Sequence, residues 1–394
     1  IKKIIDGAHF TPTYIEKSND SIPFLRVTDL HSKEILLDEV KYIPTSEHQE
    51  LIKRCNPEVG DLLLSKNGTI GLMKIIDWDW EFSIFVSLCL LKFEKTLLNK
   101  FFFYFFESNI VDRQLFESSQ KTSVSNLHLE KIKELRLTLP PIEEQTTIAN
   151  YLDHKTTQID TLIAKKEQFI ILLQEERTAV INHAVTKGLD PKVKMKDYGI
   201  EWLGEIPEHW EVKKLKFVSK ITRGAILRPV DEPSYFDDNG EWTYLNISDA
   251  TICDKYLDYG KLRLSELGST KSARVEPNNL IITASATIGK PFINKIPVCV
   301  HDGFIPITEL KVNIDFLYNY FKNPQLFNGL GKSNTQKNIY LEDVKNLIIP
   351  IPNLEEQLLI ARYIEEEIIR IETLISKSQQ EIELLKEYKT ALIS

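Results

Sequence analysis

The 394-residue sequence has only four cysteines, and no two of them are close enough to form a CxxC pair. Scattered cysteines argue against both a zinc site and a disulfide framework, so we expect reduced thiols. No apolar run approaches the roughly 18 residues that cross a membrane. The first residues, IKKIIDGAHF, lack the apolar middle and the cleavage site of a signal peptide. We therefore expect a cytoplasmic protein without membrane attachment.

Recognisable catalytic and cofactor-binding motifs are also lacking. The segment NGLGKS ends like a phosphate-binding loop, but the position of the required first glycine is occupied by Leu326. The histidines show no HExxH or similar ligand spacing. The segment LPPI at 139–142 lacks the polar and aromatic residues of an adenine methyltransferase loop, and no GxGxxG is present. We expect no metal site, no bound cofactor and no catalytic site, which excludes an enzyme.

Positive charge is in deficit as well, because the formal net charge is −8. Taken alone, this argues against binding to nucleic acid, which requires a basic face. The excess acid, however, is concentrated in two segments. Residues 143–187 hold seven acidic and five basic residues, and residues 355–394 hold nine and five. The remainder is nearly neutral and can present local basic loops, while the acidic segments suit a protein partner.

The sequence does contain an internal repeat. LPPIEEQTTIANYLDHKTTQIDTLIAKK (139–166) is matched by IPNLEEQLLIARYIEEEIIRIETLISKS (351–378), so that Glu143 corresponds to Glu355 at an offset of 212. The register holds without a gap to Ile181 and Ile393, and about half of the positions are identical. An uninterrupted register without glycine or proline is typical of a long helix, because one inserted residue would rotate all following side chains by about 100°.

Each copy carries one apolar stripe at heptad-like spacing, with proline just upstream to prevent an earlier helix start. From Glu143 to about Val185 such a helix would be roughly 65 Å long. Lys166 and Ser378 interrupt the stripes, so further partner helices are plausible. The stripe residues are Leu152, Ile159, Leu173 and Val180 in the first copy, and Ile364, Ile371, Leu385 and Leu392 in the second.

The repeat extends into the segments before each helix. GDLLLSKNGTIG (60–71) matches NNLIITASATIG (278–289), and FLRVTDL (24–30) resembles YLNISDA (244–250). Their aliphatic runs predict buried strands, and the aromatic clusters FFFYFF and FLYNYF predict core packing. We expect an α+β fold in which two mixed α/β domains alternate with two long helices. The expected divisions are residues 1–141, 142–190, 191–350 and 351–394.

The segment between the copies is expected to be a connector. Residues 187–215 are rich in glycine, proline and charge. The end of this segment, WLGEIPEHWEVKKL, has no counterpart before the first domain. We therefore expect the numbered chain to lack its natural start.

The two repeated segments, each closing a domain that carries a GTIG or ATIG turn, resemble the conserved regions of the DNA specificity subunit of Type I restriction-modification systems. The resemblance covers essentially the whole chain. It implies two target recognition domains that each read one half of a split DNA sequence, and two antiparallel helices, related with their domains by a pseudo-twofold axis, that set the gap. It further implies a non-catalytic chain. Two methyltransferase subunits would dock on the helices and bring S-adenosylmethionine, and restriction subunits would then join.

Candidate DNA-binding residues come from polar loops that match by repeat, because recognition needs side chains that reach phosphates and base edges. Serine, threonine and asparagine in such loops could equally serve only to form turns. The predicted DNA-binding residues are Lys66, Asn67, Thr69, Gln120, Lys121, Thr122, Arg223, Ser285, Thr287, Lys332, Asn334, Thr335, Gln336 and Lys337.

Outward residues at the start of each long helix are the candidates for the methyltransferase interface: Gln145, Tyr151, Gln357 and Tyr363. A tyrosine in an aliphatic helix suits an interface anchor, although it could equally pack into the helix bundle. The main alternative function is an orphan specificity-like DNA-binding or scaffold protein without active restriction partners. A fused restriction enzyme or a metabolic enzyme would need a catalytic motif that this sequence lacks.

Overall fold

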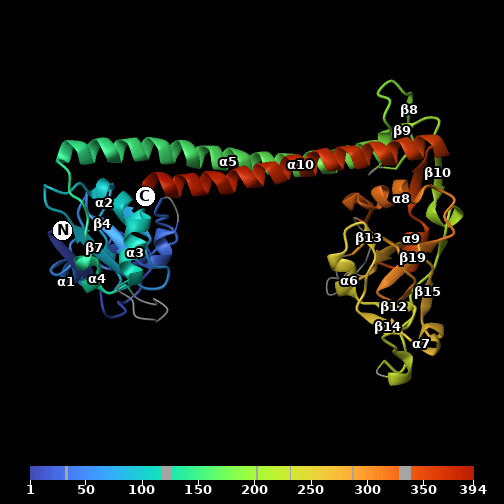
Figure 1. Cartoon of the computed structure of the whole chain (residues 1–394), viewed down its shortest axis with the longest axis horizontal. Coiled ribbons are helices and arrows are strands. Elements are labelled where there is room, and N and C mark those ends of the chain that lie inside the picture. Colours follow the sequence, from blue (N-terminus) through green and yellow to red (C-terminus); the bar gives the residue numbers. More distant parts are fainter. Residues whose placement is uncertain (32–33, 118–126, 201–202, 231, 286–287, 328–338) are drawn as a thin grey trace. The chain divides into compact units, whose positions relative to one another are not determined.

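The computed structural model describes residues 1–31, 34–117, 127–200, 203–230, 232–285, 288–327 and 339–394. The chain divides into two compact units, which are described one at a time. Unit 1 is formed by Ile1–Glu167 and Gln379–Ser394, and unit 2 by Gln168–Ser378. The two long helices, α5 (Ile142–Lys187) and α10 (Leu354–Ile393), each contribute residues to both units (Figure 1).

The described residues of unit 1 form two sheets. The larger sheet is antiparallel with strand order β1-β7-β4-β5, and the smaller has the order β3-β2-β6, with β6 parallel to β2. The strands are β1 (Lys3–Asp6), β2 (Ser21–Leu25), β3 (Lys41–Pro44), β4 (Leu62–Ser65), β5 (Met73–Ile75), β6 (Ser83–Ile84) and β7 (Leu88–Lys92). The helices are η1 (Val27–Leu30), α1 (Thr45–Ile52), α2 (Asn99–Glu107), α3 (Asn109–Glu117) and α4 (Leu129–Glu134).

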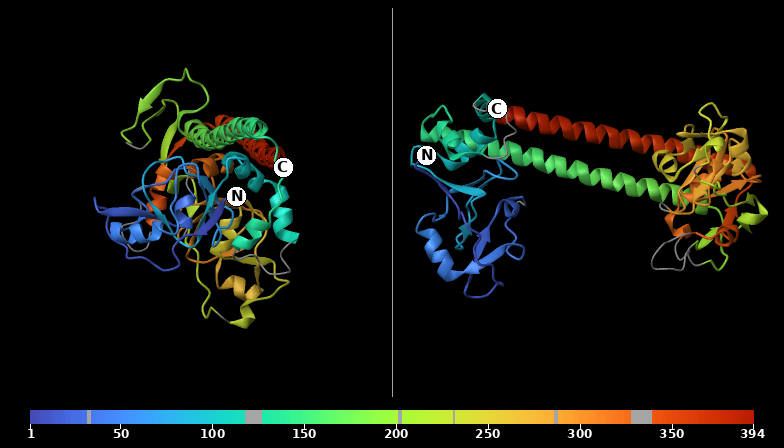
Figure 2. Two further views of the ribbon diagram at one scale, coloured as in Figure 1. Left: turned by 90° about the vertical axis from the view of Figure 1, so that its left-hand side faces the viewer. Right: turned by 90° about the horizontal axis from the view of Figure 1, so that it is seen from below.

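Strand β4 illustrates how the sequence produces this core. All of its side chains are buried, because alternate residues of a strand face opposite sides of a sheet and both sides are covered. Leu63 belongs to the apolar cluster that includes residues of the smaller sheet, whereas Leu62 and Leu64 belong to the cluster that includes Phe102 of α2. Figure 2 shows the blue segment with β2, β3 and α1 on the side of unit 1 away from α5. The predicted strand in DLLLS is confirmed.

Unit 2 also contains a larger and a smaller sheet, with strand orders β11-β19-β16-β17-β13 and β14-β12-β18-β15. The sheet strands are β11 (Lys220–Ile221), β12 (Trp242–Leu245), β13 (Tyr256–Leu257), β14 (Leu262–Leu264), β15 (Ala273–Val275), β16 (Leu280–Thr283), β17 (Pro291–Asn294), β18 (Val298–Val300) and β19 (Phe304–Thr308). The helices are η2 (Leu215–Phe217), η3 (Pro233–Tyr235), α6 (Ile247–Ile252), α7 (Glu266–Thr270), α8 (Ile314–Phe321), η4 (Pro324–Phe327) and α9 (Leu341–Lys345).

The central strand of unit 2 is buried in the same way as that of unit 1. Strand β16 lies between β19 and β17, and all of its side chains are buried. Ile281 faces the smaller sheet, whereas Leu280 and Ile282 pack against Phe316 of α8. The aromatic clusters of α2 and α8 therefore lie in the core, as predicted.

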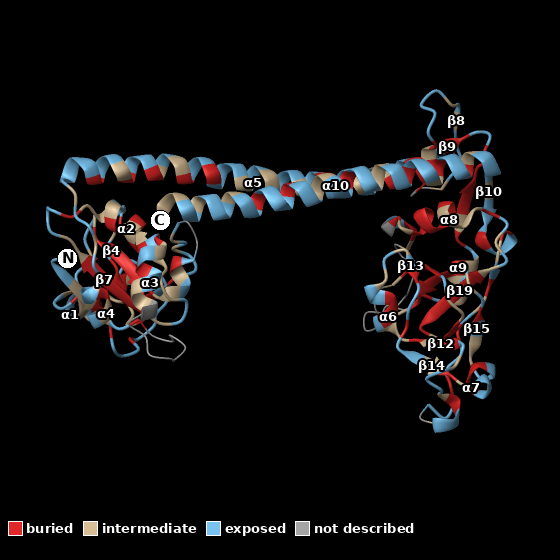
Figure 3. Ribbon diagram, viewed as in Figure 1, coloured by how far each residue is buried: buried red, intermediate tan, exposed pale blue. Residues whose placement is uncertain are grey.

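The long helices begin and end close to the predicted residues, and each places one stripe of side chains in the interior (Figure 3). In unit 1, Asp160 pairs with Lys389 (2.7 Å) and Lys166 pairs with Glu381, so these parts of α5 and α10 run antiparallel. In unit 2, Glu176 pairs with Arg370 (2.6 Å). The mixed α/β content and the long helices confirm the expected fold class at this level, and the four domain boundaries stay a prediction.

The predicted connector contributes strands rather than loop alone. Residues 195–207 form a hairpin of β8 (Met195–Asp197) and β9 (Glu205–Pro207). The next strand, β10 (Glu211–Lys214), pairs antiparallel with β20 (Ile348–Ile351), which leads into α10. Within the part of the chain that the structure describes, no helix has both the length and the apolar character needed to cross a membrane.

Candidate nucleic-acid interface

In unit 1, a buried hydroxyl closes the loop between β4 and β5, in which three of the predicted DNA-binding residues lie. Ser65 Oγ accepts a hydrogen bond from the amide of Leu72 (2.8 Å) and donates one to the carbonyl of Thr69 (2.6 Å). The amide of Gly71 donates to the carbonyl of Ser65 (3.0 Å). Gly71 has a φ of +90°, a left-handed conformation that glycine adopts without steric cost. The loop is thus a defined turn.

Unit 2 has the same turn between β16 and β17, with threonine at the position of the serine. Thr283 Oγ1 accepts from the amide of Lys290 (3.1 Å), and the Thr283 carbonyl accepts from the amide of Gly289 (2.9 Å). The next residue, Ala284, donates its amide to the carbonyl of Gly303 (2.7 Å). The corresponding bond in unit 1 runs from the amide of Lys66 to the carbonyl of Ser87 (2.9 Å).

A glycine-alanine pair approaches the neighbouring strand closely in each unit, and our sequence reasoning missed it. A Cβ atom on Gly7 would collide with the backbone of Ile84, and one on Gly224 would collide with the backbone of His301. The signal was present, because DGA at 6–8 and RGA at 223–225 match at an offset of 217, close to the offsets of the other repeated segments. The residues before these glycines are Asp6 and Arg223. Asp6 pairs with Lys66 of the unit 1 turn, and Arg223 bonds to the carbonyl of Asp302.

The three predicted residues of the unit 1 turn have different surroundings. Lys66 is buried, and its ammonium group pairs with Asp6 at 2.9 Å. Thr69 is exposed, and its hydroxyl lies 3.3 Å from the ring of His31. Asn67 is half-buried, and among the described residues none forms a hydrogen bond to its buried Oδ1. Asn67 and Thr69 therefore have polar groups near the surface, whereas the charge of Lys66 is neutralised within the unit.

The structure brings Arg223 and Ser285 of unit 2 together at the turn formed by residues 301–303. Arg223 is exposed, and its Nε donates to the carbonyl of Asp302 (3.4 Å). Ser285 is half-buried, with its hydroxyl beside Gly303. The Nδ1 of His301 accepts from the amide of Gly303 (2.9 Å), and burial lowers the pKa of His301 although Asp302 opposes the shift. The His301 imidazole is therefore neutral at neutral pH, and the Arg223 guanidinium is bonded to the carbonyl of the next residue, Asp302.

The remaining predicted DNA-binding residues lie outside the described residues. Leu127 and Ile339 are the first described residues after the gaps 118–126 and 328–338. Each is hydrogen-bonded to the turn that follows β4 or β16, which we call the strand-end turn. The amide of Leu127 donates to the carbonyl of Lys66 (2.8 Å), and that of Ile339 donates to the carbonyl of Ala284 (3.1 Å). The predicted residues concerned are Gln120, Lys121, Thr122, Thr287, Lys332, Asn334, Thr335, Gln336 and Lys337.

Two of the four residues predicted at the methyltransferase interface do not face outward. Gln145 is 0% exposed and Gln357 is 3% exposed, so the expectation of outward side chains is wrong for this pair. Both amides are instead used in hydrogen bonds inside their own unit. In each unit, the side of the first helical turn that carries the glutamine packs against the globular part of the unit. The apolar periodicity of the sequence did not indicate this contact. The two tyrosines, Tyr151 and Tyr363, are 51% and 38% exposed and remain candidates.

A polar contact fastens α5 to α2 in unit 1. The hydroxyl of Tyr104 donates to Asp153 Oδ1 (2.7 Å) and lies 3.1 Å from Thr156 Oγ1. Burial raises the pKa of Tyr104 to about 12. Burial would also raise the pKa of Asp153, but the hydrogen bonds from Lys100 and Tyr104, together with the charge of Lys100, outweigh it and lower this pKa. Asp153 is therefore ionised at neutral pH and holds both side chains of α2.

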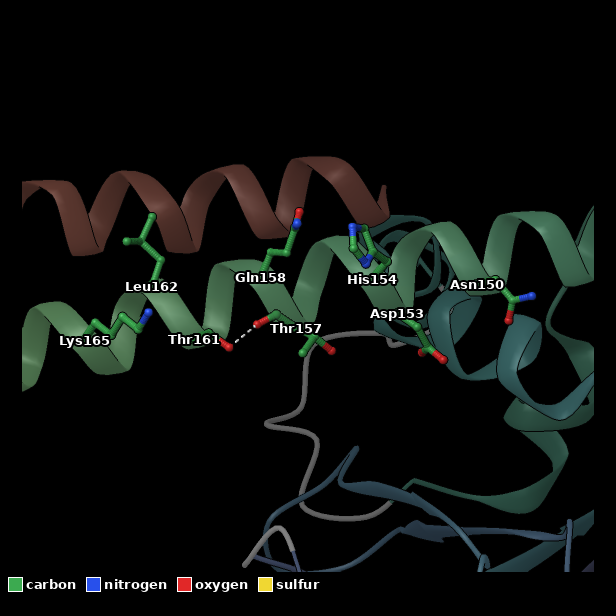
Figure 4. A pocket seen from close by; sticks show the side chains of 8 residues that line it. All are labelled: Asn150, Asp153, His154, Thr157, Gln158, Thr161, Leu162 and Lys165. Carbon is green, nitrogen blue, oxygen red and sulfur yellow. Dashed lines mark hydrogen bonds between the residues drawn. The ribbon is translucent and has the colours of Figure 1, made fainter.

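The outer side of α5 in unit 1 borders an open groove of about 790 Å³ (Figure 4). Figure 4 shows Gln158 and Leu162 pointing toward α10, with Asp153 and Thr157 on the opposite side. Such a mixed surface suits protein contact better than chemistry, and among the described residues no group of His, Cys, Asp and Glu could hold a metal ion. The groove is lined by Asn150, Asp153, His154, Thr157, Gln158, Thr161, Leu162 and Lys165.

Comparisons with known proteins show similarity to the specificity subunits of Type I restriction-modification systems. Residues 4–170 and 207–384 match the model of the Type I restriction modification DNA specificity domain. The putative type I restriction enzyme MjaX specificity subunit of Methanocaldococcus jannaschii is 25% identical, over 96% of this chain and 87% of that protein. The EcoBI specificity subunit of Escherichia coli is 24% identical, over 93% and 77%. The HsdS subunit from Thermoanaerobacter tengcongensis has a similar fold, with a TM-score of 0.62 over 97% of this chain and 90% of that one, at 17% identity.

Proposed function

The chain belongs to the family of Type I restriction-modification DNA specificity proteins, and we propose that each of its two units reads one half of a split DNA target. Its role is DNA recognition, and it is not itself an enzyme. The observation that carries the proposal is the shared construction of the units. Both have the same strand order around β4 and β16, and in both a hydroxyl closes the turn that follows this strand.

We propose that the DNA surface of each unit is formed by this turn and its neighbours. Arg223, Asn67, Thr69 and Ser285 have groups at or near the surface, and side chains of these types bond to phosphates and base edges. The predicted residues outside the described ranges belong to the same proposal. Lys66 is the weakest member, because its charge is satisfied by Asp6.

The proposed partners are two methyltransferase subunits and, through them, restriction subunits. The support is the surface of α5 and α10, which carries exposed apolar side chains that a lone chain leaves in water. The methyltransferase would supply S-adenosylmethionine and the catalytic site for adenine methylation. Exposed large apolar side chains on these helices include Tyr151, Leu162, Phe169, Leu172, Leu358, Leu359, Tyr363, Ile369, Leu384 and Tyr388.

The internal repeat further suggests that the chain arose from two copies of one domain and helix, related by a pseudo-twofold axis. In this arrangement the paired helices would separate the two recognition domains and set the gap between the half-sites. The support is the length of α5, 46 residues without interruption, together with the ion pairs that join it to α10.

Long-read methylation sequencing of host DNA, with and without this gene in the presence of its methyltransferase, tests the function directly. We expect deletion to abolish methylation at one split adenine-containing motif. The motif would also give both half-sites and the gap. An unchanged methylome would contradict the proposal and favour the orphan DNA-binding protein, for which the isolated chain should be assayed on DNA.

A change in helix length tests the role of the helices. Inserting four residues after Ala164 lengthens α5 by about 6 Å, roughly one turn. We expect the methylated motif to keep both half-sites and to change its gap, as read by methylation sequencing of cells carrying the variant. Altered half-sites with an unchanged gap would contradict this role.

A further inference from the structure

A buried glutamine lies in the first turn of each long helix and ties the helix to the globular body. Gln145 Oε1 accepts from the amide of Leu98 (2.8 Å), and its Nε2 donates to the carbonyls of Pro140 (2.8 Å) and Thr96 (2.9 Å). Leu98 is the N-cap residue of α2, which packs on the larger sheet of unit 1. One side chain therefore joins the start of α5, the proline turn before it, and the helix that covers the sheet.

Unit 2 contains the same connection. Gln357 Oε1 accepts from the amide of Asn313 (2.7 Å), the N-cap residue of α8, and its Nε2 donates to the carbonyl of Pro352 (2.8 Å). Gln357 matches Gln145 in the repeat, at the same offset of 212. The bond from the N-cap amide and the bond to the proline carbonyl thus occur twice in one chain, with different surrounding residues, which argues that the amide is required and is not a local accident.

Only a primary amide can make this set of bonds. Its carbonyl oxygen accepts a hydrogen bond, and its NH₂ group, on the same carbon, can donate two. Glutamate would keep the acceptors but lose both donors, and alanine would leave buried backbone groups without partners. Because both glutamines are almost fully buried, water cannot replace the lost bonds, and the proline turn would be free to move relative to α2 or α8.

A small movement at this point has a large effect at a distance. Helix α5 has 46 residues, so its length is about 69 Å at about 1.5 Å per residue. A tilt of about 5° at its first turn would displace the far end by about 6 Å, which is close to two base-pair steps of roughly 3.4 Å. The direction in which each helix leaves its body therefore bears on any distance that the helices set.

We propose that Gln145 and Gln357 are positioning residues that fix the exit direction of α5 and α10 and thereby restrict the DNA target to a single gap length. This inference rests on the proposed split-target function. The glutamines do not touch DNA, so they leave the half-site sequences unchanged. Their loss relaxes the gap while each unit continues to read its own half-site.

The test compares Gln145→Ala and Gln357→Ala with wild type in the full chain, together with the methyltransferase. Gln174→Ala is the matched control, because Gln174 is exposed on the same helix α5. We expect methylation at motifs whose gap differs by one base pair to rise at least fivefold relative to wild type, with both half-sites retained. The control should keep the wild-type gap. Where the alanine variant does not accumulate, Gln145→Glu retains the side-chain volume and one acceptor and takes its place.

The outcomes separate the two proposals. If wild type methylates no split motif, the proposed function itself fails. If wild type recognises one gap and folded variants methylate the same gap only, at an equal or uniformly lower level, the glutamines merely stabilise the fold and the inference is overturned. Purified complexes assayed on duplexes with the gap shortened or lengthened by one base pair should give the same ranking.

Discussion

Removing the carboxylate of Asp6 should destabilise unit 1 far more than most single substitutions do. Asp6 and Lys66 form an ion pair at 2.9 Å, and their side chains are only 11% and 9% exposed. Asp6 also lies 3.3 Å from His9. In Asp6→Asn the Lys66 ammonium group stays largely buried without a counter-charge, because its side chain is only 9% exposed.

The expected cost follows from this burial. Breaking a buried ion pair by removing one partner typically costs about 3–5 kcal/mol. The asparagine keeps a polar oxygen facing the Lys66 ammonium group, so we expect a cost at the lower end of this range, about 3 kcal/mol. The double variant Asp6→Asn/Lys66→Met removes both charges, and it should regain all but about 1 kcal/mol. Unit 2 shows that the fold does not need the pair, because Arg223 and Ala284 occupy the matching positions.

Hydrogen exchange measured by mass spectrometry can follow unit 1 separately from unit 2. A loss of about 3 kcal/mol corresponds to exchange more than about 100-fold faster in the amides of β4. The amides of β16 in unit 2 serve as the internal reference. The matched control is Asp38→Asn, because the Lys17–Asp38 pair has a similar length (2.8 Å) but an Asp38 side chain that is 92% exposed. Its exchange should change little.

Exchange in Asp6→Asn within threefold of wild type would refute the reasoning, as would a double variant no more stable than the single one. The same variants address DNA binding. If Lys66 serves only the ion pair, Asp6→Asn/Lys66→Met should bind each half-site as wild type does. A selective loss of the first half-site, with β4 exchange restored, would show instead that Lys66 reaches DNA.

Two further predictions concern a histidine in unit 1 and a carboxylate in unit 2. Burial lowers the pKa of His48 from 6.5 despite the nearby Glu81, so the unfolded chain binds the proton more readily, and the stability of unit 1 should fall as pH drops through about 6.5. Thermal unfolding between pH 5 and 8 should show this slope, and His48→Gln should flatten it. Glu356→Ala removes the acceptor of the buried indole of Trp210 (3.0 Å) and should cost about 2 kcal/mol in chemical unfolding. Glu144→Ala, at the exposed matching position in unit 1, should cost under about 0.5 kcal/mol.

The repeat made much of the fold predictable. A register that holds without a gap through both repeated segments required two long helices, and α5 begins one residue before the predicted start at Glu143. Helix α10 begins at Leu354, within the predicted segment 351–394. Aliphatic runs located β4 and β16, because a strand covered on both faces cannot alternate with polar residues. The pairing of β10 with β20 was not predictable, since the composition of the connector indicated a loop and strand partners far apart in sequence leave no local signal.

The site was less predictable, for a physical reason that Gln145 illustrates. A polar residue near a helix start is most often exposed, and only the tertiary contact with Leu98 makes this amide buried. Lys66 presents the same difficulty, because a lysine in a polar loop suggests phosphate contact until Asp6, far earlier in the chain, is seen beside it. Sequence spacing indicates which residues share an element, but it does not show which distant group satisfies a charge or an amide.

The two strand-end turns explain how one scaffold can present different chemistry. Their shape depends on backbone hydrogen bonds and on a single hydroxyl, Ser65 or Thr283, and none of these bonds involves the side chain of the residue that follows. That following residue is Lys66 in unit 1 and Ala284 in unit 2, and the turn is retained in both. Side chains next to the hydroxyl can therefore change without loss of the turn, which is the property that a protein needs if its two units are to recognise different half-sites.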